Sequence, residues 1–84
     1  MATARILDVG QCDRDHRAIA ALIEAHFAAT VDRADLVRTA YEALAQRPYD
    51  LVLVNRQIAA DETDGLQLVR LMKQHPDLSA VPVM

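Results

Sequence analysis

The stretch Leu51-Val52-Leu53-Val54 decides the fold. Four consecutive β-favouring apolar residues predict a strand covered on both faces, because a strand with one wet face would alternate polar and apolar side chains. Such a strand belongs near the centre of a sheet. Asn55 follows it directly, and a polar loop then leads to Asp64-Gly65.

A strand followed by a helix is predicted at the amino-terminal end. Residues 4–9 form a short and mostly apolar segment, and Gly10 and a polar cluster come after it. Apolar residues at helical spacing then predict an amphipathic helix over residues 14–28. Asp13 is a better N-cap for this helix than Cys12.

A second strand and helix are predicted between these two strands. An extended piece at residues 30–33 precedes Asp35, which is suited to cap a helix that ends before Pro48. The apolar stripe of this helix consists of Leu36, Val37, Ala40, Tyr41 and Leu44.

The carboxyl-terminal part predicts one more helix and the start of one more strand. The helix runs from an N-cap at Asp64 to His75-Pro76, and residues 81–84 begin a fourth strand. Strands that alternate with helices through short connections predict an α/β domain, with a parallel sheet of about four strands and three helices on its two faces.

The composition favours a single cytoplasmic domain. The chain has 84 residues and a formal charge of −3, and it has no Lys/Arg cluster that would attract nucleic acid or an anionic membrane. No apolar run is long enough to span a membrane, and the amino terminus lacks the pattern of a secretory signal. The single cysteine, Cys12, cannot form an internal disulfide.

The candidate site lies where the predicted strands end, because parallel α/β sheets bind ligands at the carboxyl ends of their strands. Gly10 and Gln11 follow the first predicted strand, and Asn55 follows the central one. We therefore expect these three residues to lie at one edge of the sheet.

Taken in order, these pieces resemble the receiver (CheY-like) domain of bacterial response regulators. The resemblance implies two-component signalling or a phosphorelay, and an incomplete flavodoxin-like, doubly wound fold. On this resemblance, residues 1–84 correspond to the N-terminal two-thirds of the family's domain. The chain would then be a version of that domain that is truncated at its carboxyl end. The motifs that carry the resemblance are Arg5-Ile6-Leu7, Tyr49-Asp50-Leu51-Val52-Leu53-Val54, Asp64-Gly65-Leu66 and Val81-Pro82-Val83.

The resemblance also implies a phosphoryl-transfer site whose carboxylates this chain lacks. In the family, an aspartate at the end of the third strand accepts the phosphoryl group, and two acidic residues after the first strand help to hold Mg²⁺. These positions fall on Asn55, Gly10 and Gln11. An amide is a poor nucleophile, and Mg²⁺ is normally held through carboxylate oxygens. The sequence therefore predicts a pseudo-receiver with no phosphoacceptor, no bound metal and no cofactor.

Three further residues are possible pocket residues. Asp8 shares a strand face with Gly10, one step deeper, where it could substitute for the missing acid. A buried Asp8 bonded to neighbouring groups is the simpler interpretation. Arg56 and Asp64 bound the loop after Asn55, which is longer than the family's loop and lacks its typical proline. The histidines show no metal-binding spacing and are predicted to lie on the surface.

Three functions stay open at this point. The first is a phosphorylation-independent receiver-like module that binds a protein partner, such as a signalling protein or an output domain, or a second copy through the exposed fourth strand. The second is a small α/β enzyme that uses Cys12 or Asp8. The third is a non-functional fragment of a longer response regulator. A retained scaffold with an erased pocket favours the first, which is not an enzyme.

Overall fold

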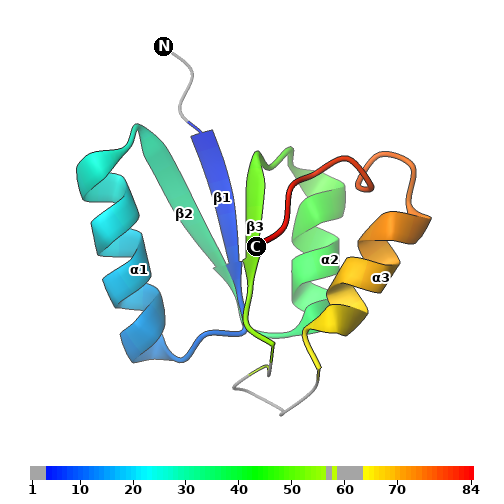
Figure 1. Ribbon diagram of the computed structural model, residues 1–84, viewed down its shortest axis with the longest axis horizontal. Coiled ribbons are helices and arrows are strands. Elements are labelled where there is room, and N and C mark those ends of the chain that lie inside the picture. The colour runs from blue at the N-terminus through cyan, green and yellow to red at the C-terminus, as the bar shows by residue number, and fades with distance from the viewer. Residues whose placement is uncertain (1–3, 57, 59–63) are drawn as a thin grey trace.

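Three strands alternate with three helices in the computed structural model, which describes residues 4–56, 58 and 64–84 (Figure 1). The first strand is longer than the third, whose four residues are the apolar run that the sequence singled out. The elements are, in chain order, β1 (Ala4–Val9), α1 (Asp13–His26), β2 (Ala29–Ala34), α2 (Val37–Gln46), β3 (Leu51–Val54) and α3 (Leu66–Gln74).

The strands form a parallel sheet in the order β2-β1-β3. Placing β1 between its neighbours sets Asp8 opposite Arg33 of β2 and Leu53 of β3. The central strand of the three is therefore β1, and not β3 as the sequence predicted. The segment after α3 pairs with the other edge of β3.

The expected fourth strand is reduced to one isolated bridge, between Val52 and Val83. The amide of Val52 donates to the Pro82 carbonyl, and the amide of Met84 donates to the Val52 carbonyl, both at 2.9 Å. Pro82 has no N–H, so it cannot add a donor of its own. The prediction of about four strands is therefore corrected to three strands and a parallel bridge.

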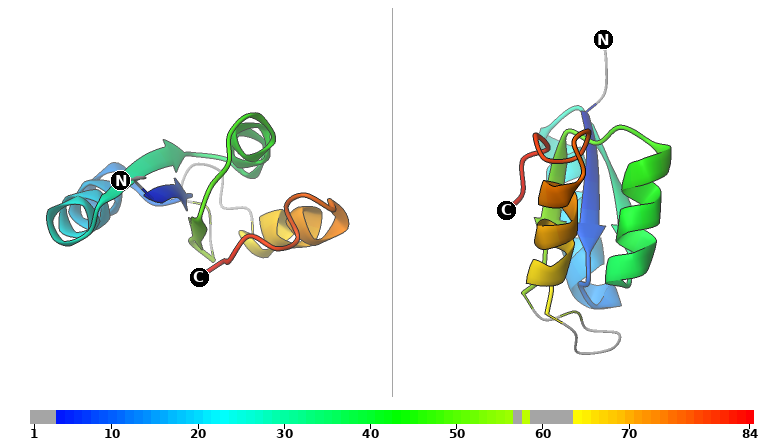
Figure 2. Two further views of the ribbon diagram at one scale, coloured as in Figure 1. Left: turned by 90° about the horizontal axis from the view of Figure 1, so that it is seen from above. Right: turned by 90° about the vertical axis from the view of Figure 1, so that its right-hand side faces the viewer.

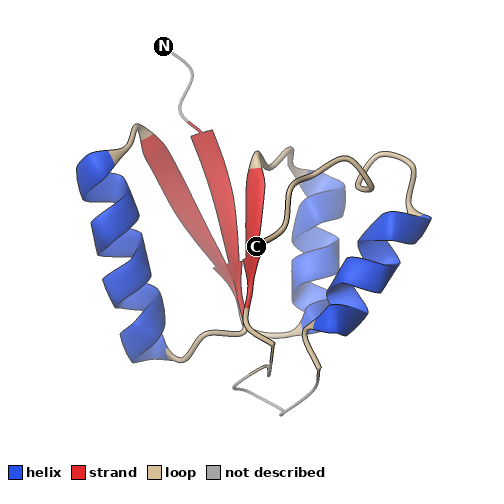
Figure 3. Ribbon diagram, viewed as in Figure 1, coloured by secondary structure: helices blue, strands red, loops and turns tan. Residues whose placement is uncertain are grey.

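The helices cover the two faces of the sheet unequally. Figures 1 and 3 show α1 on one side of the sheet and α2 and α3 together on the other. Two further views show that the carboxyl-terminal segment lies alongside β3 (Figure 2). The predicted arrangement of three helices on two faces is confirmed.

The hydrophobic core lies between the sheet and the helix pair α2 and α3. Leu7, Val9 and Val52 on the strands are completely buried. Ala40 and Leu44 of α2 and Leu68 and Met72 of α3 pack against them in one cluster. Within α1, which is described throughout, no residue is buried. The α1 face is thus the more thinly covered one.

Both predicted N-caps near Arg33 are wrong. The N-cap of α1 is Cys12, and that of α2 is Leu36. The Arg33 side chain forms ion pairs with Asp13 and, at 3.0 Å from Nε to Oδ1, with Asp35. The carboxylates that would have capped the helices are therefore taken up by a cation from β2.

The other helix ends follow the sequence closely. α1 ends at His26, two residues before the predicted boundary, and α2 ends before Pro48 as expected. The N-cap of α3 is Gly65, and Asp64 Oδ1 still accepts a hydrogen bond of 2.9 Å from the Leu66 amide. No helix of the described ranges has the length and apolar content that a membrane span requires.

Tyr49 gives the fold a dependence on alkaline pH. Burial of its ring, together with a 2.8 Å hydrogen bond donated to Asp32 Oδ2, raises the pKa of Tyr49 above its ordinary value of 10.0. A raised pKa in the folded state stabilises the protein below pH 10.0, and that contribution is lost as the pH rises through the folded pKa.

We expect the urea midpoint of the wild type to fall more steeply above about pH 10 than that of Tyr49→Phe, which cannot ionise. Urea titrations followed by circular dichroism at several alkaline pH values test this. Parallel curves for the two proteins would contradict it.

Candidate functional site

The structure brings Gly10 and Asn55 together at the carboxyl edge of the sheet, at the bottom of the view in Figure 1. The Gly10 amide donates to the Ala34 carbonyl at 2.9 Å, and the Asn55 amide donates to the Val9 carbonyl at 3.0 Å. Asn55 Nδ2 also donates to the Gly10 carbonyl at 3.4 Å. The Asn55 side chain thus ties the two strand ends to each other.

Ile58 fills the space above Gly10. The side chain of Ile58 is completely buried, and a Cβ built on Gly10 would overlap its Cδ1 and lie 3.2 Å from its Cα. Gly10 has a φ of +83°, in the region that favours glycine. At this position the site presents backbone and an apolar side chain. No sequence pattern indicated this contact, because Ile58 lies in an aperiodic loop.

Gly65 closes the other side of Asn55. A Cβ at Gly65 would overlap the Asn55 carbonyl oxygen and lie 2.6 Å from Val54 Cγ1. The Gly65 amide donates to the Arg56 carbonyl at 2.6 Å. The start of α3 therefore sits directly against the end of β3, where any side chain at this position would collide with backbone.

Asp8 lies one step below Gly10 and is completely buried. Its Oδ2 is 2.7 Å from His16 Nδ1 on α1. None of the described residues provides a hydrogen-bond partner for Oδ1. Asp8 is therefore engaged with α1 beneath the site.

His16 is the functional neighbour that the sequence interpretation missed. It was predicted to lie on the surface, but only 16% of its side chain is exposed. The imidazole faces the sheet because position 16 lies one helical turn after the N-cap, on the side of α1 that covers β1. An aspartate inside an apolar strand was the one available signal, since a buried carboxylate requires a partner.

Gln11 is held through its backbone by Arg33. Arg33 Nη2 donates to the Gln11 carbonyl at 3.3 Å, and the same guanidinium pairs with Asp13 and Asp35. The hydrogen bond from Arg33 holds the pKa of Asp13 below its ordinary value, and it raises the pKa of Arg33. The turn after β1 is thereby fixed by the Arg33 guanidinium.

Arg56, Asp64 and Cys12 lie at the rim of the site. Arg56 Nε and Asp64 Oδ1 are 4.0 Å apart, and 80% and 46% of their side chains are exposed, so solvent screens the pair. Cys12 is a free and exposed thiol. Apart from Arg56 and Ile58, the predicted longer loop lies outside the described residues.

Metal ligands do not gather at the site as far as the structure describes it. Within residues 4–56, 58 and 64–84, no group of three or more His, Cys, Asp or Glu side chains could hold a metal ion. Asp8 is committed to His16, and Asp13 to Arg33. The arrangement can therefore pack and hydrogen bond, but it offers no described carboxylate to a cation above Gly10.

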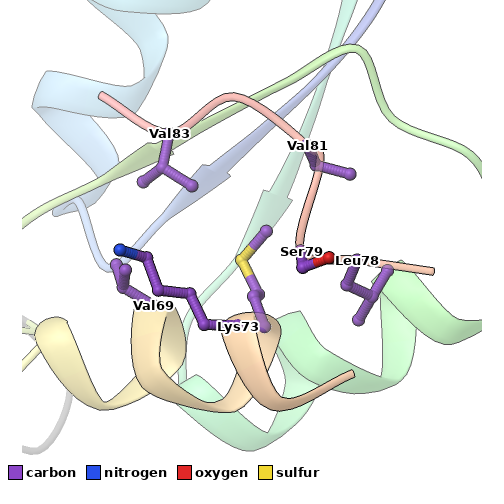
Figure 4. A pocket seen from close by; sticks show the side chains of 7 residues that line it. Val69, Lys73, Leu78, Ser79, Val81 and Val83 are labelled. Atoms are coloured by element: carbon purple, nitrogen blue, oxygen red, sulfur yellow. The ribbon is translucent and has the colours of Figure 1, made fainter. Parts of the chain in front are cut away.

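A separate cavity of about 390 Å³ lies between α3 and the carboxyl-terminal segment (Figure 4). Figure 4 shows Val81 and Val83 across from Val69 and Lys73 of α3. Its lining is apolar apart from Lys73 and Ser79, and it contains no carboxylate, thiol or imidazole. This cavity is therefore a gap in packing beside the bridge to β3, and it has no set of groups for catalysis.

The strand order and the position of the site define the class of protein. A parallel sheet in the order 2-1-3, with helices on both faces and a site at the strand ends, belongs to the flavodoxin-like doubly wound folds. The chain has part of a CheY-like fold.

Solved structures agree with this assignment. The chain is similar to a response regulator receiver domain (CheY-like) from Methylobacillus flagellatus, with a TM-score of 0.78 and 23% identity over 89% of this chain and 61% of that one. It is also similar to NtrX from Brucella abortus, with a TM-score of 0.76 and 26% identity over 98% of this chain. A structure of NtrX in complex with ATP gives a TM-score of 0.77 and the same identity.

The chain spans 61% of the first of these proteins and 18% of NtrX. No protein-family model matches the sequence. No curated protein matches it either.

Proposed function

We propose that residues 1–84 act as a pseudo-receiver, a receiver-like module of two-component signalling that works by binding a protein partner and takes no phosphoryl group. The partner is a signalling protein or an output domain in the cytoplasm. In this proposal Asn55 stands at the phosphoacceptor position, and Gly10 and Gln11 stand at the positions of the acidic pair.

The packing of Ile58 on Gly10 carries the proposal. A phosphoryl group with its Mg²⁺ needs an open, carboxylate-lined space at the strand ends. Here an isoleucine that is completely buried takes up the space beside Gly10, and the Asn55 amide is bonded to the Gly10 carbonyl. Asp13 and Asp35 are already paired with Arg33, so neither is a free ligand for a divalent cation at the turn.

The enzyme alternative has no specific observation in its favour. Asp8 is buried and bonded to His16, so it cannot reach a substrate above Gly10. Cys12 is exposed, and none of the hydrogen bonds among the described residues joins its thiol to a base. A nucleophile needs such a base or a lowered pKa.

The test is treatment with acetyl phosphate and Mg²⁺, read by intact-protein mass. We expect no gain of a phosphoryl group by the wild type. We also expect none by Asn55→Asp, because Gly10 and Gln11 would still supply no carboxylate for Mg²⁺. A receiver domain that carries all three carboxylates is the positive control. A gain of a phosphoryl group by the wild type would contradict the proposal.

A further inference from the structure

Among the described strands, β2 is an outer strand of the sheet, and half of its backbone groups point away from β1. The Gly10 amide donates to the Ala34 carbonyl, so residue 34 of β2 bonds inward. Because successive residues of a strand direct their backbone groups to opposite sides, the even-numbered residues of β2 bond to β1, and residues 29, 31 and 33 point outward. Outward backbone groups of this kind can pair with a strand of another chain unless something covers them.

The Glu24 side chain covers the middle of this outward edge. The Val31 amide donates to Glu24 Oε2 at 3.1 Å, from β2 to a residue near the end of α1. The Ala29 amide is also bonded, to the Phe27 carbonyl at 2.9 Å, in the turn that leads into β2. Two of the three outward amides of β2 are therefore occupied from within the chain, and a side chain occupies the central one.

β2 lacks the other features that commonly protect an edge strand. Its sequence, ATVDRA, contains no proline and no lysine, and its register with β1 is continuous, without a bulge. Its two charged side chains are already engaged within the chain. Asp32 accepts a 2.8 Å hydrogen bond from the Tyr49 hydroxyl, and Arg33 pairs with Asp13 and Asp35.

The outward edge of β2 is also compatible with a second copy of itself. In an antiparallel pair with a two-fold axis at Val31, residues i and 62 − i face each other. Val31 then faces Val31 of the second copy, and the two residues exchange N–H and C=O hydrogen bonds. Asp32 faces Thr30 and Arg33 faces Ala29, so no like charges oppose each other. The carboxylate of Glu24 is what occupies the central amide that this pairing requires.

We propose that Glu24 is an edge guard: its carboxylate closes the outward edge of β2 and prevents two copies of the chain from pairing through β2. This contact does not depend on the function of the strand-end site, because neither Glu24 nor Val31 takes part in that site. It also differs from pairing through the bridge segment at Val83, which lies at the opposite edge of the sheet.

Glu24→Ala tests the guard, because alanine removes the carboxylate and favours the helix. We expect this variant to dimerise with a dissociation constant lower than that of the wild type by about tenfold or more, since neither copy has to break its own bond to Val31. Sedimentation equilibrium measures the dissociation constants. Backbone amide shifts of ¹⁵N-labelled protein, followed against concentration, locate the contact, and we expect the changes to centre on residues 29, 31 and 33.

Two control variants remove the same charge and leave the edge closed. Glu24→Gln keeps an oxygen acceptor for the Val31 amide. Glu42→Ala removes an exposed carboxylate from α2. We expect both variants to associate no more strongly than the wild type, and circular dichroism checks that each variant is folded.

Hydrogen exchange tests the contact in dilute protein, where the chains are apart. We expect the Val31 amide to exchange about fivefold faster in Glu24→Ala than in the wild type, because it loses its acceptor. The Asp32 amide, which points toward β1, should keep its rate.

Three results would overturn the proposal. One is a Glu24→Ala variant that associates no more strongly than Glu42→Ala or Glu24→Gln. Another is an association of Glu24→Ala whose shift changes centre on Val83 and leave residues 29, 31 and 33 unchanged. The third is an exchange rate at Val31 that is the same in Glu24→Ala and the wild type.

Discussion

His16→Ala is expected to lower the free energy of unfolding by about 1–3 kcal/mol, which is the range for leaving a buried polar group without its hydrogen-bond partner. Asp8 is completely buried, and its Oδ2 lies 2.7 Å from His16 Nδ1. Its Oδ1 has no hydrogen-bond partner among the described residues. Without the imidazole, both carboxylate oxygens lack a partner. Urea unfolding followed by circular dichroism measures the loss.

Replacing both Asp8 and His16 distinguishes the cost of leaving Asp8 without a partner from the cost of lost packing. We expect Asp8→Val combined with His16→Ala to recover most of the stability, because apolar replacement of a buried pair is often neutral. His26→Ala removes an imidazole that is exposed on the same helix and should change stability by less than about 0.5 kcal/mol. A His16→Ala loss no larger than that of the His26 control would contradict the account of Asp8.

Gly10→Ala is expected to destabilise the fold by about 2–5 kcal/mol, through two separate costs. An L-residue at a φ of +83° is strained, and its Cβ would overlap Cδ1 of the buried Ile58. The change adds only one methyl group, so a large effect would show how tightly the strand end is packed.

A double-mutant cycle with Ile58→Ala separates the two costs. Ile58→Ala alone should lose about 2–5 kcal/mol, as for other buried large-to-small changes. In that background Gly10→Ala keeps its backbone strain but loses the overlap, so its further cost should be smaller than in the wild type. Equal costs in both backgrounds would show that Ile58 does not pack on Gly10.

The elements of the fold could be predicted from the sequence because they depend on local patterns. The run that ends at Val54 identified a strand, and parallel strands that share a carboxyl edge brought Gly10 and Asn55 together. The caps could not be predicted, since Asp13 begins α1 and Asp35 follows β2, yet both are drawn to Arg33. No local pattern indicates which distant cation a carboxylate will meet.

The chemistry of the site was predicted less completely than its position. The absence of carboxylates at residues 10 and 55 could be read from the sequence, but the side chain that fills the space could not, because Ile58 belongs to a loop without periodicity. The partner of Asp8 depends on how α1 is rotated against the sheet. That rotation is set by packing, and it placed His16 against β1.

The central claim is that the strand-end site is filled and takes no phosphoryl group. Beryllofluoride, an analogue of the phosphoryl group, tests it most directly when it is added with Mg²⁺ to ¹⁵N-labelled protein. We predict that the backbone amides of Gly10, Gln11 and Asn55 keep their chemical shifts at saturating reagent. Saturable shifts centred on these three amides would contradict the claim.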